Sequence, residues 1–209
     1  MSILQAKKPQ RRIPSDFVTR NGTMRLVRSR YEGKKISLED FLAWEPPTDG
    51  RKYEWNQGVI ETNEASITFK ETIIAENIIF AFDQTIYRQQ RDVLLSEVNI
   101  ELFGGAKIRR SDIAYISSVQ RNEAKIGGKP IPSFVIEIVS THDKVNGIKE
   151  KLRDYFAAGV QVVWYVYPNY EEVEVYTAPG NIAVCKGEMR CSAAPALPEF
   201  SMKASDVFA

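Results

Sequence analysis

Two acidic residues in apolar surroundings are the strongest chemical signal in the chain. Glu137 interrupts an apolar strand-like run at 134–139, and Asp112 lies in a strand-like run at 107–116, on the same face as Ala114 and Ile116. An ionised carboxylate in such a strand costs on the order of several kcal/mol unless it is paired, hydrogen-bonded or bound to a cation. Two such acids, with a lysine on the helix after the second strand, are the minimum set for binding a divalent cation and activating a water at a phosphate. A structural ion-pair cluster is the alternative that the residues leave open.

Other site chemistries have little support in the sequence. The chain holds only Cys185, Cys191 and His142 as soft metal ligands, so a tetrahedral zinc site would need nearly all of them. Residues 140–143 read Ser-Thr-His-Asp, but the chain has no G-x-S-x-G elbow, and neighbours in one loop seldom reach triad geometry. We expect Asp143 to cap the helix that follows it.

The overall composition is typical of a globular protein with a buried core. The 209 residues are 44% hydrophobic and 26% charged, with 28 basic and 27 acidic side chains and a net charge of +1. This balance argues against a general polyanion-coating protein. No run approaches the roughly 18 apolar residues of a membrane helix. Because the chain has two cysteines and no apolar leader segment, we expect a soluble cytoplasmic protein with free thiols.

The charge is distributed unevenly along the chain. Residues 1–35 hold ten basic and two acidic residues, which leaves eighteen basic and twenty-five acidic residues in the remainder. We therefore predict a basic, partly mobile N-terminal arm at 1–35 and a single domain at 36–209. The arm is either a solvated tail or a contact for the phosphate backbone of a nucleic acid.

Hydrophobic spacing and turn residues predict the elements that position the two acids. Apolar spacings of three and four, with capping residues, predict helices over 37–44, 69–89 and 144–158. Strands are predicted as a hairpin at 52–61 and as runs at 93–103, 107–116, 134–139, 162–167, 172–176 and 182–186. A strand at 134–139, a helix and a strand at 162–167 form a right-handed crossover unit. We therefore expect a mixed α/β sheet with helices on both faces.

Three segments carry a resemblance to a known family: RKYEWNQGVIE at 51–61, RRSDIAYIS at 109–117, and FVIEIVSTHDKVNGIKEKLRDYFAAGVQVVWYVYP at 134–168. Over residues 37–208 the chain resembles the Uma-two family, a branch of the PD-(D/E)XK nuclease superfamily. The most specific part is the spacing of Glu137, Ser140, Asp143, Lys151, Tyr155, Gly159-Val160 and the run from Trp164 to Pro168. The resemblance implies a restriction-endonuclease-like α/β core, with a four-stranded mixed central sheet flanked by helices and with additional β-hairpins.

The resemblance also implies a set of site residues. Asp112 takes the place of the first motif acid and Glu137 that of the second, and both would hold Mg²⁺, or Mn²⁺, together with the main-chain carbonyl of Ile138. The usual third catalytic position, two residues after the second acid, is Val139 here. In this branch the lysine lies on the next helix, fourteen residues after the glutamate, at Lys151. It would orient the attacking water or neutralise the phosphate.

Further residues are assigned with alternatives. Glu54 matches a recurrent family acid that would complete the acidic cluster, although a hairpin residue could equally face solvent. Helical geometry does not choose between Lys151 and Lys149, which flank opposite edges of the apolar stripe, so the choice of Lys151 rests on the resemblance. Basic residues outside the acidic cluster could contact a phosphate backbone: Arg109, Arg110, Lys125 and Lys129.

These observations lead to one expected function and one alternative. We expect a Mg²⁺-dependent DNA endonuclease that hydrolyses phosphodiester bonds. A homodimer is expected because cutting both strands usually needs two active sites. The alternative is a catalytically inactive module that binds nucleic acid or protein and retains the nuclease fold.

Overall fold

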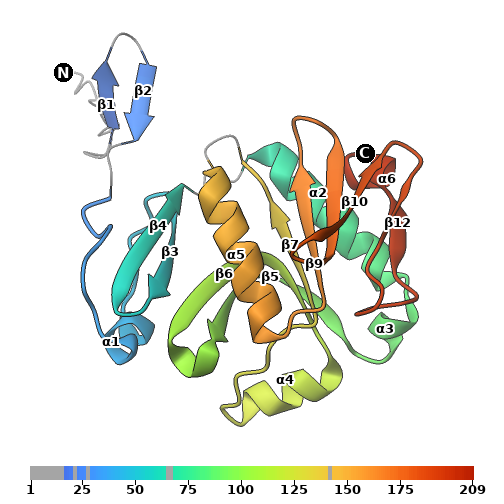
Figure 1. The fold of residues 1–209 in the computed structure, drawn as a ribbon, viewed down its shortest axis with the longest axis horizontal. Helices are drawn as coiled ribbons and strands as arrows, with labels where there is room; N and C mark the ends of the chain where they lie inside the picture. Colours follow the sequence, from blue (N-terminus) through green and yellow to red (C-terminus); the bar gives the residue numbers. More distant parts are fainter. Residues whose placement is uncertain (1–16, 21–22, 27–28, 65–67, 141–142) are drawn as a thin grey trace, which may run out of the picture.

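A computed structural model describes residues 17–20, 23–26, 29–64, 68–140 and 143–209 of the chain (Figure 1). Its centre is an eight-stranded sheet in the order β10-β9-β8-β7-β6-β3-β4, with β5 paired to β6. The strands are β3 (Arg51–Asn56), β4 (Val59–Glu64), β5 (Val93–Leu102), β6 (Lys107–Ile116), β7 (Phe134–Ile138), β8 (Val162–Tyr167), β9 (Glu172–Ala178) and β10 (Asn181–Lys186). The helices are α1 (Leu38–Ala43), α2 (Phe69–Asp83), α3 (Ile86–Gln89), α4 (Ser118–Lys125), α5 (Val145–Ala158) and α6 (Ala204–Val207).

The pairing of the central strands confirms the predicted mixed α/β sheet. β6 runs antiparallel to both β5 and β7, whereas β7 and β8 are parallel and are connected through α5. The sheet is wider than the four strands implied by the resemblance, because the hairpin β3–β4 extends it beyond β6 and the hairpin β9–β10 extends it beyond β8. Short two-stranded sheets are formed by β1 (Phe17–Arg20) with β2 (Thr23–Leu26) and by β11 (Arg190–Ser192) with β12 (Ser201–Lys203).

Helices cover both faces of the sheet, as predicted. Alternate strand residues point to opposite faces. One set, which includes Ile136 and Trp164, packs with the buried face of α2. The other set, which includes Val135 and Val163, packs with Leu152 on α5 (Figure 1). The face under α5 is also the face that receives the side chain of Glu137, since Glu137 is two residues from Val135 in the same strand.

One edge of β6 is shared by two strands, and the interval between them becomes the candidate site. β3 pairs with β6 only at residues 107–108, and β7 pairs with β6 only at residues 113–114. Within the described part of the chain, residues 109–112 of β6 have no strand partner on this edge. Side chains from β3, β7 and α5 can therefore reach the backbone and side chains of this part of β6.

Several elements differ from the prediction. The helix predicted over 69–89 is two helices, because the hydroxyl and the backbone N–H of Thr85 both donate to the carbonyl of Phe82 and end α2. α4, the β11–β12 pair and α6 were not predicted, nor was the β1–β2 hairpin within the basic arm. Residues 1–16 of that arm lie outside the described residues. None of the described helices is both long and apolar enough to cross a membrane.

Candidate active site

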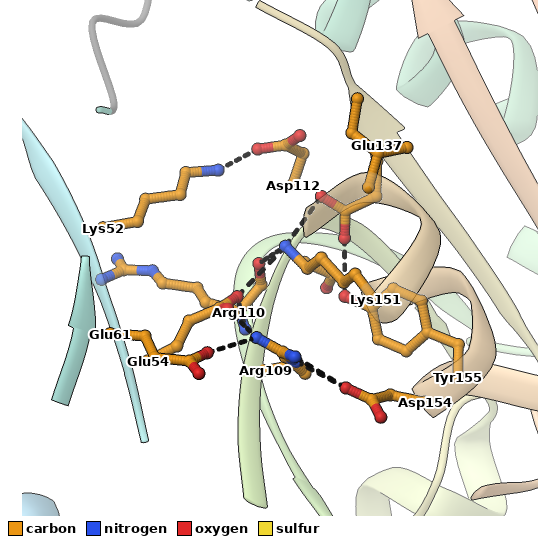
Figure 2. A network of polar contacts seen from close by, with 12 residues as sticks. Lys52, Glu54, Glu61, Arg109, Arg110, Asp112, Glu137, Lys151, Asp154 and Tyr155 are labelled. Carbon is orange, nitrogen blue, oxygen red and sulfur yellow. Dashed lines mark hydrogen bonds and ion pairs between the residues drawn. The ribbon is translucent and has the colours of Figure 1, made fainter. Parts of the chain in front are cut away.

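A cleft of about 630 Å³ opens beside the unpaired part of β6. Its walls come from the hairpin β3–β4, from β6 and β7, and from the first half of α5. All the predicted site residues line this cleft: Glu54, Asp112, Glu137, Ile138 and Lys151. The structure therefore brings together residues that are up to 97 positions apart in the sequence. Figure 2 shows the side chains of Glu54, Asp112, Glu137 and Lys151 converging from the hairpin, the central strands and α5.

Glu137 is 6% exposed, and both of its carboxylate oxygens have partners. The hydroxyl of Tyr155 donates to Oε1 at 2.6 Å, and Lys151 Nζ lies 3.0 Å from Oε2. Burial raises the pKa of Glu137 to about 7, and the negative charge of Asp112 adds to this rise, although Lys151 opposes it. Glu137 is therefore a carboxyl group that can gain or lose a proton near neutral pH.

Asp112 is held by the main chain on one side and by a lysine on the other. The backbone N–H of Ile138 donates to Oδ2 at 2.7 Å, which ties the first acid to the strand that carries the second. Oδ1 forms an ion pair with Lys52. The carboxylate of Asp112 thus has one oxygen fixed by β7 and one oxygen directed toward a cation.

Lys151 is fully engaged by its neighbours. Its Nζ donates to Glu137 Oε2 at 3.0 Å and to the carbonyl of Arg110 at 2.7 Å, and it lies 3.1 Å from Glu54 Oε1. Burial alone would lower the pKa of this ammonium, but the charges of Glu137 and Glu54 outweigh burial and raise the pKa well above its usual value. Lys151 is therefore a permanent positive charge at the centre of the acidic cluster.

Glu54 is fully buried, so the interpretation that it faces solvent is wrong. Its Oε2 accepts from Arg109 at 2.8 Å, and its Oε1 accepts from the backbone N–H of Arg110 at 2.9 Å. Burial favours a higher pKa, but Lys151 and Arg109 together lower the pKa of Glu54 below its usual value. Glu54 is thus an ionised part of the cluster.

Side chains replace the missing strand partner of β6. The N–H of Arg110 donates to Glu54 and its C=O accepts from Lys151, so both main-chain groups are satisfied without a ladder. This arrangement explains how the edge of β6 can stay open beside a cleft, since buried main-chain groups need partners. It also fixes Glu54 and Lys151 relative to the strand that carries Asp112.

Arg109 was expected to contact a phosphate backbone, and this expectation is wrong. The side chain is 5% exposed, and it contacts four carboxylates at 2.8 to 2.9 Å: Glu54, Glu61, Glu150 and Asp154. Four of these contacts are hydrogen bonds, and a second guanidinium nitrogen lies 2.8 Å from Asp154 as an ion pair. Figure 2 shows Arg109 among Glu54, Glu61 and Asp154. Arg109 therefore joins the hairpin β3–β4 to α5 and is surrounded by carboxylates.

Sequence reasoning missed Lys52 and Glu97. Lys52 precedes Glu54 by two residues in β3, so both side chains lie on the cleft face of the hairpin. Lys52 Nζ contacts Asp112 and also lies 3.0 Å from Glu97 Oε1. The period-2 pattern of β3 could have placed Lys52 beside Glu54, but it could not show that this face is buried by the rest of the site.

Two loop predictions have different outcomes. Asp143 does not cap α5: its Oδ2 accepts from the backbone N–H of Ser140 at 2.7 Å, and α5 begins after Lys144 without a side-chain cap. His142 lies outside the described residues. At its other end, α5 stops at Gly159, which has a left-handed φ of 105°.

The donor chemistry of the cleft fits Mg²⁺. Carboxylate and carbonyl oxygens are the ligands of hard divalent cations, and Mg²⁺ commonly binds through one or two carboxylates while keeping several waters. Asp112 and Glu137 are near enough for the charge of Asp112 to raise the pKa of Glu137, and the ammonium of Lys52 already stands against Asp112 as a cation. No cluster of three or more His, Cys, Asp or Glu side chains suited to a metal occurs in the described residues, so a metal here would be held by fewer side chains.

Comparison with known proteins gives the chain its family. The model of the Uma2 family, described as "Putative restriction endonuclease", matches residues 38–205. A solved structure described as "a putative nuclease belonging to DUF820", from Anabaena variabilis ATCC 29413, is similar with a TM-score of 0.68 and 19% identity, over 83% of this chain and 97% of that chain. No curated protein matches the chain. The structural similarity confirms the predicted fold. Because the family model spans most of its length, the chain belongs to the Uma2 family.

Proposed function

We propose that this protein is a divalent-metal-dependent endonuclease that hydrolyses phosphodiester bonds of DNA. The observation that supports this most directly is the placement of Asp112 and Glu137 in one cleft, with Lys151 between Glu137 and Glu54, in a chain of the Uma2 family. The acids and the lysine are the residue types that phosphodiester hydrolysis requires, because negative charge grows on the scissile phosphate.

Asp112, Glu137 and the main-chain carbonyl of Ile138 would hold the metal, with Mg²⁺ preferred and Mn²⁺ as a substitute. When bound, such a cation stabilises charge on the phosphate and lowers the pKa of a bound water.

The rest of the site prepares these ligands. Tyr155 and Lys151 hold the two oxygens of Glu137, so the carboxylate has a fixed orientation. The N–H of Ile138 fixes one oxygen of Asp112. Arg109 and the N–H of Arg110 fix Glu54, which in turn holds Lys151. The site is therefore preorganised by protein groups, and little reorganisation accompanies the reaction.

The negative charge of the cleft favours the binding of a cation over the binding of a polyanion such as DNA. Among the described residues that line the cleft, nine are acidic and four are basic. DNA would be repelled by such a surface unless bound cations and basic residues elsewhere compensate. We therefore assign a supporting role in DNA binding to the basic N-terminal arm. The homodimer and the cytoplasmic location stay predictions.

The test is cleavage of supercoiled plasmid and of labelled single-stranded DNA by the purified protein with Mg²⁺ or Mn²⁺. Glu137→Ala and Lys151→Ala remove two members of the cluster. Lys149→Ala is the matched control, because Lys149 is an exposed lysine on the same helix that does not line the cleft. We expect metal-dependent nicking by the wild type and the control, and loss of nicking in the two site variants.

Two other outcomes would redirect the proposal. If the wild type binds DNA without cutting it, the alternative of an inactive binding module becomes the better account. If nicking persists unchanged in Glu137→Ala, the activity comes from another site or from a contaminant.

A further inference from the structure

The cleft contains two lysines near the candidate metal ligands, and their hydrogen-bonding capacities differ. An ammonium has three N–H donors. Lys151 has three acceptors within 3.1 Å, namely Glu137, Glu54 and the carbonyl of Arg110. It can donate to a substrate only by giving up one of the contacts that hold the cluster together.

Lys52 has only two acceptors among the described residues, Asp112 and Glu97. Its third N–H therefore has no acceptor in this part of the chain, and its side chain lines the cleft. In Figure 2 Lys52 extends from the hairpin toward Asp112, on the opposite side of the cluster from Tyr155. Lys52 is thus the lysine with a donor available to a ligand in the cleft.

The position of Lys52 depends on an unusual residue in the neighbouring strand. Glu97 has a φ of +57°, a left-handed conformation in the middle of β5. The register of β5 with β6 pairs Ser96 with Ile113 and Val98 with Ser111, and so skips both Glu97 and Asp112. Glu97 contacts Lys52 at 3.0 Å and Arg110 at 2.8 Å. This interruption of the ladder holds Lys52 next to Asp112.

We propose that Lys52 is the lysine that contacts the scissile phosphate, and that Lys151 is a positioning residue that orients Glu137 and Glu54. This inference rests on the proposed function and refines it. The Lys52 ammonium neutralises Asp112 in an ion pair. With a divalent cation held by Asp112, the Lys52 ammonium would no longer be needed to neutralise this carboxylate. Lys52 would then be free to donate to a phosphate oxygen, which accepts hydrogen bonds and carries negative charge.

The salt dependence of DNA binding distinguishes a lysine that contacts a phosphate from a lysine that only positions other residues. Each phosphate that a protein cation neutralises contributes about 0.9 to the slope of log K against log salt on duplex DNA. A short labelled duplex is titrated by fluorescence anisotropy at several salt concentrations, once with Ca²⁺ in place of Mg²⁺ and once with EDTA. The proteins are the wild type, Lys52→Met, Lys52→Arg, Lys151→Met and the exposed control Lys149→Met.

We expect Lys52→Met to lower the slope by about one with Ca²⁺ and by less in EDTA, where the charge of Lys52 is offset by its ion pairs with Asp112 and Glu97. Lys52→Arg keeps the charge and the slope. Lys151→Met and Lys149→Met keep the slope. In the plasmid assay Lys52→Met lowers nicking by about a hundredfold, as loss of one donor to a developing charge does elsewhere.

A structural failure of Lys52→Met is recognised by two further measurements. Circular dichroism and thermal unfolding report whether the fold persists, and Mn²⁺ binding followed by electron paramagnetic resonance reports whether the acids are still in place. We expect Mn²⁺ affinity no weaker than that of the wild type, because a competing ammonium has been removed from Asp112.

Failure of this inference is distinguishable from failure of the proposed function. If the wild type nicks plasmid and Lys52→Met nicks equally well with an unchanged slope, Lys52 does not contact the phosphate and the nuclease proposal stands. If the wild type does not nick but Lys52→Met still lowers the slope, the phosphate contact is supported and the nuclease proposal fails. If the wild type neither nicks nor binds DNA, both are overturned.

Discussion

At the scale of single residues, the raised pKa of Glu137 gives the proposed metal site a pH dependence. Burial, with a contribution from Asp112, raises the pKa of this carboxyl to about 7. Below pH 7 the neutral acid predominates, so a metal must displace a proton in order to bind. We expect the Kd for Mn²⁺, measured by isothermal titration calorimetry, to be constant above about pH 8 and to rise by up to about tenfold for each pH unit below 7.

Glu137→Gln provides the control for this titration. The amide cannot exchange a proton in this range, so the variant should bind Mn²⁺ more than about tenfold more weakly at pH 8, with a much flatter pH profile. A wild-type Kd that does not change between pH 8 and pH 6 would show that Glu137 is not a ligand.

Tyr155 also affects the protonation equilibrium of Glu137. Its hydroxyl donates to Glu137 Oε1 at 2.6 Å, and this hydrogen bond stabilises the ionised carboxylate. Tyr155→Phe removes the donor and leaves the ring, so the pKa of Glu137 should rise. We expect the midpoint of the pH profile of Mn²⁺ binding to move to higher pH in this variant. A midpoint that moves to lower pH, or stays in place, would contradict the assigned role of Tyr155.

The individual site residues were predictable to different degrees. Asp112 and Glu137 stand out in the sequence because each is an acid in an apolar strand-like run. Glu54 and Lys151 came from family resemblance, since neither spacing nor amphipathic pattern shows which side of a hairpin or helix faces the acids. Lys52 was missed because a lysine before a tyrosine in a hairpin looks like a solvent-exposed residue. Only the tertiary structure shows that Asp112 lies opposite it.

At the scale of elements, a buried ion-pair network attaches α5 and the β3–β4 hairpin to β6. Arg109 lies at its centre, and Lys107 joins it through ion pairs to Glu150 at 3.1 Å and Asp154 at 2.9 Å. The network sets the distance between the hairpin that carries Glu54 and the helix that carries Lys151. The precision of the site therefore depends on residues that never touch a ligand.

Arg109→Met tests this network. The substitution leaves buried carboxylates without their common cation, and removal of one partner from a buried pair typically costs about 3 to 5 kcal/mol. We expect a loss of this size in the free energy of unfolding from urea denaturation. Lys186→Met is the control: its ion pair with Glu172 is at the surface, with the lysine side chain 57% exposed, and should contribute less than about 1 kcal/mol. Similar losses for the two variants would contradict a special role for Arg109.

The helices and strands were predictable where the sequence pattern is compatible with only one type of secondary structure. The run at 162–167 is a strand with the predicted bounds, because apolar and β-branched residues dominate it. The run at 107–116 also has the predicted bounds, although five of its ten residues are polar or charged. The helix over 69–89 was predicted as one piece because the apolar spacing continues through the break at residues 84–85. α4 was missed because it has no buried residue, so no apolar stripe marks it.

At the scale of the whole molecule, acidic and basic charge are separated. The cleft is predominantly acidic, and the basic excess of the chain lies in its first 35 residues. Deletion of residues 1–28 removes seven basic residues and one acidic residue and leaves the segment matched by the family model intact. We expect weaker DNA binding with a lower salt slope, about 0.9 lower for each phosphate that the arm neutralises in the full chain, and an unchanged Kd for Mn²⁺.

The arm contributes to DNA binding separately from the cleft only if the deletion weakens DNA binding and leaves the Kd for Mn²⁺ unchanged. If the deletion leaves DNA affinity and its salt slope unchanged, the arm is a solvated tail.

Sedimentation of the full chain at several protein concentrations tests the predicted homodimer independently. The sequence predicted the charge separation because it is a matter of counting, whereas the cleft itself depends on strand pairing that no local pattern reveals.

We expect Asp112 and Glu137 to bind a divalent cation together. Crystals of the full chain soaked in Mn²⁺ test this binding most directly. Anomalous diffraction locates manganese without reference to activity. We predict a peak about 2.1 to 2.3 Å from carboxylate oxygens of both residues, with the Lys52 ammonium displaced from Asp112. Crystals that bind no manganese at this position, with the ion pair between Lys52 and Asp112 intact at saturating Mn²⁺, would contradict the account.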